Sequence, residues 1–141
     1  MDTLTEMEVK TKRKITNDGL VTIIGGFDEL HEGHYFTLGF GRALGTQLVV
    51  GLEPDQGKRF FEDYHKRADQ LLGTKVVEDV DTIVDVEKFL KKWMPAIHCI
   101  RKNQKSDKAE EISACLELGI EIVLIPDMNF KERQPYTRYE Y

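Results

Sequence analysis

Two histidines three positions apart, His31 and His34, are the side chains of this sequence whose type and spacing best suit chemistry. They follow two consecutive glycines, Gly25 and Gly26, which come after an apolar run rich in β-branched residues at 20–24. A segment of helical character follows them. Glycine backbone, the positive end of a helix and imidazole N–H groups all suit phosphate oxygens. The pattern therefore predicts phosphate chemistry, in which the imidazoles stabilise charge that develops at a phosphorus centre and its leaving group.

Metal binding and a purely structural role are the two other interpretations of this histidine pair. A zinc site needs three or four protein ligands. The other histidines, His65 and His98, form no ligand-like cluster with the pair. The spacing also differs from the helical zinc-protease motif, in which the two histidines lie about four positions apart. The sequence therefore favours phosphate contact, and we expect no metal site made by protein side chains.

Alternating strand-like and helix-like segments supply the frame that must position the histidines. Strands are expected at 20–25, 47–52, 75–80, 96–100 and 120–125, and helices at 35–44, 61–72, 82–93 and from Ser106 or Asp107 to 118. This alternation predicts a Rossmann-like three-layer α/β fold, with a five-stranded parallel sheet covered by helices on both faces. Ligands bind such sheets beyond the carboxyl ends of the strands, where the strand order reverses. The histidine segment leaves the first strand at this end.

Length and composition restrict the class of protein. The 141 residues suit a polar N-terminal tail at 1–18 followed by one domain at 19–141. A net charge of −5 argues against a dedicated nucleic-acid binder. The apolar runs have the length of strands, so no membrane partner is expected, and the N-terminus lacks the regions of a signal peptide. Cys99 and Cys115 are expected to be reduced thiols, which favours a cytoplasmic location.

Several of these segments resemble the cytidylyltransferase-like nucleotidyltransferase family. Gly25-Gly26-Phe27-Asp28 is similar to the family's Gly-Thr-Phe-Asp segment, and His31-Glu32-Gly33-His34 is similar to its His-x-Gly-His motif. Tyr64 and Arg67 fall where the family has Tyr-x-x-Arg, and the resemblance extends over residues 20–126. Within the family, glycerol-3-phosphate cytidylyltransferases and sugar-phosphate nucleotidyltransferases look most similar.

The resemblance implies a one-step transfer of a nucleoside monophosphate. A small phosphorylated alcohol or sugar attacks the α-phosphorus of a nucleoside triphosphate, Mg²⁺ accompanies the triphosphate, and pyrophosphate leaves. CTP is the favoured donor, so that CMP is transferred, and ATP is the donor for related adenylyltransferases. An ATP-using adenylyltransferase and a non-catalytic nucleotide-binding module with a degenerate C-terminal motif stay open as alternatives. Related enzymes are often dimers, so a homodimer is a further expectation.

The resemblance also implies roles for individual residues. The residues that it implies for catalysis are His31, His34 and Lys58. The residues that it implies for nucleotide binding are Gly25, Gly26, Phe27, Asp28, Gly33, Arg59, Arg101, Thr137 and Arg138. Within this set, Asp28 is expected to order its turn through backbone hydrogen bonds more than to touch substrate. Arg101 opens a basic stretch where the family has Gly-x-Asp. For Arg67, a surface charge on a helix and a functional contact are both open interpretations.

Overall fold

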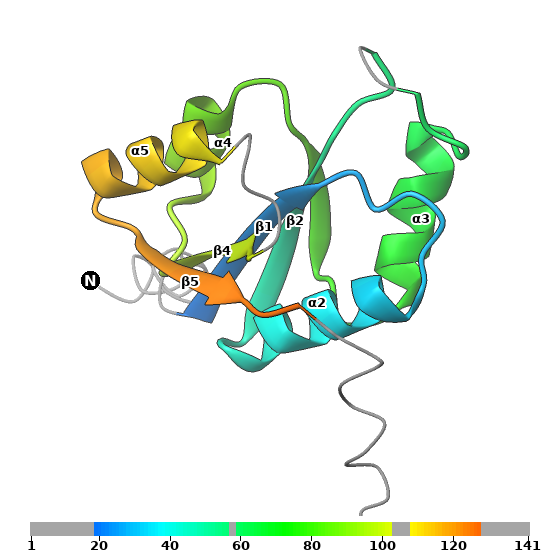
Figure 1. Cartoon of the computed structure of the whole chain (residues 1–141), viewed down its shortest axis with the longest axis horizontal. Helices are drawn as coiled ribbons and strands as arrows, with labels where there is room; N and C mark the ends of the chain where they lie inside the picture. The colour runs from blue at the N-terminus through cyan, green and yellow to red at the C-terminus, as the bar shows by residue number, and fades with distance from the viewer. Residues whose placement is uncertain (1–18, 57–58, 103–107, 128–141) are drawn as a thin grey trace, which may run out of the picture.

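A five-stranded, all-parallel sheet forms the centre of the computed structural model, with the strand order β3-β2-β1-β4-β5 (Figure 1). The strands are β1 (Leu20–Gly25), β2 (Gln47–Leu52), β3 (Asp79–Thr82), β4 (Ile97–Arg101) and β5 (Glu121–Ile125). The chain builds β2 and β3 on one side of β1, and then returns to build β4 and β5 on the other side. The strand order therefore reverses between β1 and β4, where sheets of this kind bind ligands.

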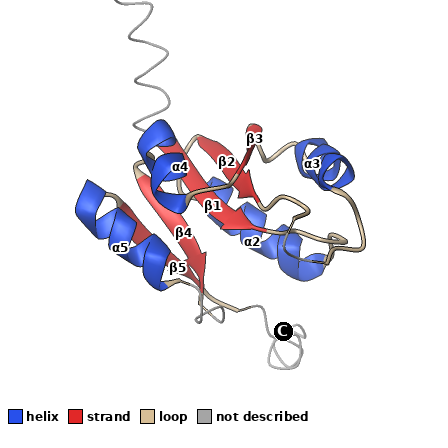
Figure 2. Cartoon of the chain, turned by 90° about the horizontal axis from the view of Figure 1, so that it is seen from above, coloured by secondary structure: helices blue, strands red, loops and turns tan. Residues whose placement is uncertain are grey.

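Within the described residues, four helices cover the two faces of the sheet (Figure 2). They are α2 (Glu32–Ala43), α3 (Tyr64–Gly73), α4 (Val86–Trp93) and α5 (Ala109–Leu118). Alternate residues of β1 point to opposite faces, as in any strand. Val21 and Ile23 share a core with Leu38 of α2 and Leu71 of α3. On the other face, Leu20 and Ile24 share a second core with residues of α4 and α5. The predicted three-layer Rossmann-like fold is confirmed.

The structure describes residues 19–56, 59–102 and 108–127. The predicted tail at 1–18 lies outside these residues, so the boundary between tail and domain stays a prediction. Three predicted site residues, Lys58, Thr137 and Arg138, also lie outside them.

Side-chain caps explain why three helices begin elsewhere than predicted. α2 begins at Glu32 and not at residue 35, because the side chain of His31 caps it. α3 and α4 begin at Tyr64 and Val86, after the N-caps Asp63 and Asp85, and not at residues 61 and 82. An N-cap carboxylate accepts hydrogen bonds from backbone N–H groups that the first helical turn leaves unpaired.

Two other predicted boundaries were wrong. The N-cap of α5 is Lys108, without a side-chain cap bond, and not Ser106 or Asp107, which lie outside the described residues. The third strand pairs with β2 only from Asp79 to Thr82 and not over 75–80, because Lys75 adopts a left-handed turn with φ 71°.

The two cysteines are buried free thiols, as predicted. Burial raises the pKa of Cys99 to about 12, and burial followed by the charge of Glu111 raises the pKa of Cys115 to about 11. Both groups are therefore protonated and unreactive near neutral pH. Within the part of the chain that the structure describes, no helix has the length and apolar character needed to cross a membrane.

A buried chain of polar groups ties α5 to the centre of the sheet. His98 on β4 is fully buried, and its two ring nitrogens lie 2.8 Å from Thr22 Oγ1 on β1 and 2.8 Å from Glu111 Oε1 on α5. Lys108 donates to the second carboxylate oxygen of Glu111, also at 2.8 Å. Every member of the chain has a partner, which is the condition for tolerating buried polar groups.

We predict that Glu111→Ala lowers the free energy of unfolding by about 3–5 kcal/mol, because it leaves buried partners unpaired. Burial alone would raise the pKa of Glu111, but hydrogen bonds and charge from His98 and Lys108 outweigh it and lower the pKa. The charged form therefore stabilises the fold above the ordinary pKa of 4.5, and this stabilisation is lost as the pH falls further. Urea unfolding at pH 7 and pH 4 measures both effects. The exposed neighbour Glu110 is the matched control, and an equal effect of Glu110→Ala would contradict the prediction.

Candidate functional site

The two histidines cap α2 reciprocally. His31 is the N-cap residue, and its Nδ1 accepts a hydrogen bond of 3.0 Å from the backbone N–H of Gly33. In return, Nδ1 of His34 accepts one of 3.3 Å from the backbone N–H of His31. This is a capping box made by two imidazoles in place of the usual hydroxyl and carboxylate. The His-x-Gly-His spacing therefore has a structural cause at the helix start.

The cap also decides where the ring protons lie. A neutral imidazole carries one N–H donor and one acceptor nitrogen. Because Nδ1 accepts a backbone hydrogen bond in both His31 and His34, the proton of each neutral ring lies on Nε2. The two rings are stacked, with their centroids 3.9 Å apart and an angle of 24° between their planes. The pair thus carries two Nε2–H donors, on stacked rings, at the positive end of a helix.

The two rings differ in their exposure. His31 is exposed, whereas His34 is only 8% exposed and packs against the ring of Phe27. Burial, followed by electrostatic interactions with His31 and Arg101, lowers the pKa of His34 to about 4, although Asp28 opposes this shift. At neutral pH, His34 is therefore an uncharged hydrogen-bond donor, whose strength as a donor comes from orientation and not from charge.

The glycines of the site make room for neighbouring aromatic rings. A Cβ atom on Gly33 would lie 3.0 Å from Cε1 of His31, so any larger residue at this position would crowd the capping ring. A Cβ on Gly26 would lie 2.7 Å from the ring of Phe60, and one on Gly25 would lie 3.0 Å from the ring of Phe27. The backbone at these glycines therefore lies close to aromatic side chains of the protein, and its approach to phosphate oxygens stays a prediction.

The loop that leaves β1 is strained, and a second segment holds it in place. Phe27 and Glu29 have the left-handed φ values of 45° and 50°, which are uncommon outside glycine. The carboxylate of Asp28 accepts hydrogen bonds from the backbone N–H groups of Phe61 at 2.8 Å and Glu62 at 3.0 Å. Glu29 donates its backbone N–H to the Glu62 carboxylate at 3.0 Å. Asp28 therefore orders the backbone, as expected, but that of a segment distant in sequence.

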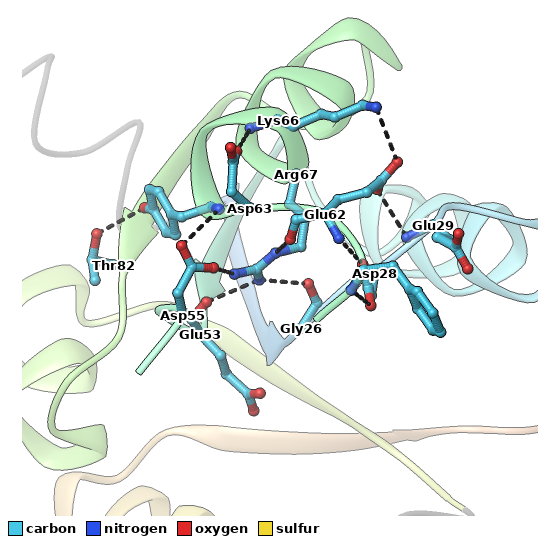
Figure 3. A network of polar contacts seen from close by, with 12 residues as sticks. Gly26, Asp28, Glu29, Glu53, Asp55, Glu62, Asp63, Lys66, Arg67 and Thr82 are labelled. Atoms are coloured by element: carbon cyan, nitrogen blue, oxygen red, sulfur yellow. Dashed lines mark hydrogen bonds and ion pairs between the residues drawn. The ribbon is translucent and has the colours of Figure 1, made fainter. Parts of the chain in front are cut away.

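Arg67 joins the loops around the site (Figure 3). Its guanidinium donates to the backbone oxygens of Gly26, Glu53 and Glu62, each at 2.9 Å, and to Asp55 Oδ1 at 2.7 Å. The ring of Phe60 lies 3.7 Å from the guanidinium carbon and stacks on it. These contacts connect the ends of β1 and β2 to the start of α3, and the hydrogen bond from Arg67 lowers the pKa of Asp55.

Arg67 is fully buried, so the interpretation as a surface charge on a helix was wrong. The physical reason is that the loops of the site converge on this point and present backbone oxygens that need donors. Its place in the Tyr-x-x-Arg resemblance was the available sequence signal. Sequence reasoning missed Phe60 and Glu62, because Phe60 packs on Gly26 and Glu62 binds Glu29, and both partners lie far away along the chain.

The structure brings most of the predicted site residues together. His31, His34, Gly25, Gly26, Phe27, Asp28 and Gly33 lie within one loop and helix start. Arg101, at the carboxyl end of β4, is half-buried and near enough to lower the pKa of His34. Its own pKa is lowered by burial, against the opposing charges of Asp127 and Glu53. Arg59 lies apart on the segment that docks onto the β1 loop, with its side chain exposed.

Known proteins with similar sequences or structures agree with the family resemblance of the sequence. No family model matches the chain. An ethanolamine-phosphate cytidylyltransferase from Dictyostelium discoideum is 35% identical over 71 residues, which cover 45% of this chain and 20% of that protein. A lipopolysaccharide core biosynthesis protein from Thermoplasma volcanium GSS1 has a similar structure, with a TM-score of 0.66 and 30% sequence identity over 78% of this chain and 96% of that one. The chain belongs to the cytidylyltransferase-like nucleotidyltransferase family.

The other comparisons bear on this nucleotidyltransferase fold alone. Pantothenate synthetase from Thermus thermophilus has a TM-score of 0.57 and 12% identity, over 86% of this chain and 60% of that one. This similarity shows that the two proteins share a fold, and it says nothing about the chemistry of the chain. The chain spans about a fifth of the length of the Dictyostelium cytidylyltransferase that it matches.

We predict that Arg67→Lys lowers the free energy of unfolding by about 3 kcal/mol, because an ammonium cannot reach four separated acceptors at once. Urea unfolding measures the change. Arg42→Lys is the matched control, since Arg42 is partly exposed and bonds one backbone oxygen and Glu78. The control should change stability by less than about 1 kcal/mol. Equal stability of Arg67→Lys and the parent would contradict the assignment of Arg67 as the centre of the loop network.

Proposed function

We propose that the chain transfers a nucleoside monophosphate, with CMP favoured, from a nucleoside triphosphate to a small phosphorylated alcohol or sugar. The observation that carries this proposal is the histidine cap, which leaves two Nε2–H donors at the start of α2. The Dictyostelium relative is named as an ethanolamine-phosphate cytidylyltransferase, which supports both the cytidine donor and the phosphorylated alcohol. A cytoplasmic location and a homodimer stay predictions.

The proposed reaction needs no protein nucleophile. A phosphate oxygen of the acceptor attacks the α-phosphorus and forms a new P–O bond, while the bond from the α-phosphorus to the bridging oxygen breaks. Pyrophosphate leaves with the electron pair of that bond. The protein's part is to align the reactants and to stabilise the negative charge that grows on the leaving group. Fixed donors suit this task because they need no reorientation during the reaction.

In this proposal, the histidines and the basic side chains contact different parts of the substrates. His31 and His34 donate from Nε2 to phosphate oxygens at the reacting centre, and the backbone of 25–34 approaches the same phosphates. Arg101 adds a permanent positive charge beside His34. We propose that the exposed guanidinium of Arg59 contacts the acceptor or the triphosphate, together with Lys58, which precedes it in sequence. Thr137 and Arg138 are proposed as further triphosphate contacts.

Mg²⁺ is proposed to accompany the triphosphate. Among the described residues, no group of three His, Cys, Asp or Glu side chains could hold a metal ion. This suits Mg²⁺, which sites of this chemistry hold mainly through substrate phosphates, with one or two carboxylates at most. When bound, it would neutralise charge on the phosphate oxygens. We propose Glu53, whose carboxylate lies close to Gly26, as an acidic side chain that would share Mg²⁺ with the phosphates.

We predict that His31→Asn and His34→Asn each lower the turnover number at least about 10²-fold while leaving the fold intact. Asparagine is a preferred N-cap residue, and its Oδ1 can replace Nδ1 as the acceptor for the helix start, but it has no donor at the position of Nε2. Pyrophosphate release in the presence of Mg²⁺, CTP or ATP, and a panel of phosphorylated alcohols and sugars measures the rate.

His65→Asn, at an exposed position on α3, is the control and should leave the rate unchanged. Unchanged rates for both active-site variants, with release still measurable, would contradict the role of the histidines. Nucleotide binding without pyrophosphate release across the whole panel would favour the non-catalytic module instead.

A further inference from the structure

Two adjacent phenylalanines at the rim of the site have opposite environments. The ring of Phe60 is turned inward, where it stacks on Arg67 and fills the space beside Gly26. The ring of Phe61 is 85% exposed. Leaving a large apolar ring in water forgoes the stabilisation that its burial would contribute to the fold. An exposed aromatic ring beside a functional site is a common feature of binding surfaces.

The backbone that carries Phe61 is held firmly. Its N–H donates to Asp28 Oδ2 at 2.8 Å, and the N–H of the next residue, Glu62, donates to the other oxygen at 3.0 Å. The ring therefore projects from a backbone fixed to the β1 loop. A ring that is positioned in advance loses little conformational freedom when it contacts a ligand.

A hollow of about 430 Å³ lies at this position, lined by Arg59, Phe60 and Phe61. This volume is within the range of small-molecule sites. The hollow adjoins the β1 loop, because Phe60 packs on Gly26 and the carboxylate of Asp28 accepts a hydrogen bond from the backbone N–H of Phe61. It combines an exposed guanidinium with an exposed aromatic face. A ligand with an anionic end and a flat apolar end matches both features.

We propose that this hollow receives the non-reacting end of the acceptor, and that the acceptor is a phosphomonoester carrying a planar ring, which stacks on Phe61. The proposal rests on the proposed nucleotidyl transfer, and it names the class of acceptor for that reaction. Arg59 faces the phosphate end of the acceptor. A polyol phosphate without a ring leaves the face of Phe61 in water and so gains nothing from it.

Two probes that differ only by the ring test this proposal. Riboflavin 5′-phosphate and ribitol 5-phosphate share the phosphate and the polyol chain, and only the first carries a planar ring. Flavin fluorescence reports its binding directly, and calorimetry reports the binding of both. We expect riboflavin 5′-phosphate to bind on the order of tenfold more tightly, which corresponds to one stacked ring. Phe61→Ala should remove this difference, and Phe61→Trp should keep it.

Val84→Ala, at an apolar position that is 87% exposed elsewhere on the surface, is the control and should leave both affinities unchanged. Equal affinities of the parent for the two probes would overturn the proposal. It is likewise overturned if Phe61→Ala dissociates a dimer but leaves both affinities unchanged, since the ring then serves a second copy of the chain.

Pyrophosphate release with CTP or ATP separates this proposal from the proposed function. Release with ribitol 5-phosphate, but neither binding nor release with riboflavin 5′-phosphate, overturns the ring site while the nucleotidyl transfer stands. Ring-dependent binding that Phe61→Ala removes, without release from any acceptor, supports the ring site and overturns the transfer reaction.

Discussion

The reciprocal cap between His31 and His34 is the interaction on which the rest of the site depends. One pair of backbone hydrogen bonds starts α2, stacks the two rings and assigns their protons to Nε2. Without the cap, each ring could exchange tautomers and rotate, and the donors would have no fixed direction. The burial of His34 also stabilises the cap, because it keeps the ring uncharged and so preserves the acceptor nitrogen that the cap requires. The helix cap and the proposed phosphate contacts thus use opposite nitrogens, Nδ1 and Nε2, of the same two rings.

A second constraint sets the loops around the cap. Arg67 takes a charged group out of water, and this is tolerable because four oxygens and an aromatic face surround it. Its acceptors lie on the loops after β1 and β2 and just before α3. The strained backbone at Phe27 and Glu29 persists because Asp28 and Glu62 bind these loops together. The loops around the histidine cap are therefore held together by side chains outside the histidine motif.

The sheet and the position of the histidine segment could be predicted from the sequence, because both depend on patterns within short stretches of the chain. Apolar runs at 20–25 and 47–52 predicted β1 and β2 at the observed bounds, since buried parallel strands read as continuous hydrophobic segments. The third strand was displaced because the polar pattern of Asp79–Thr82 carries no such signal. Helix starts moved because the caps Asp63 and Asp85 act through single hydrogen bonds that periodicity does not reveal. The burial of Arg67 could not be predicted, because its partners are backbone oxygens up to 41 residues away.

The position of the proton on each imidazole shows whether the cap fixes both rings as Nε2–H donors. Nitrogen NMR of the histidine side chains at neutral pH distinguishes a protonated, pyrrole-type nitrogen from an unprotonated, pyridine-type one. For both His31 and His34, we predict that Nδ1 is of the pyridine type and Nε2 of the pyrrole type, and that added CTP with Mg²⁺ shifts the Nε2 signals. Protons on Nδ1, or Nε2 signals that do not respond while the nucleotide binds, would contradict it.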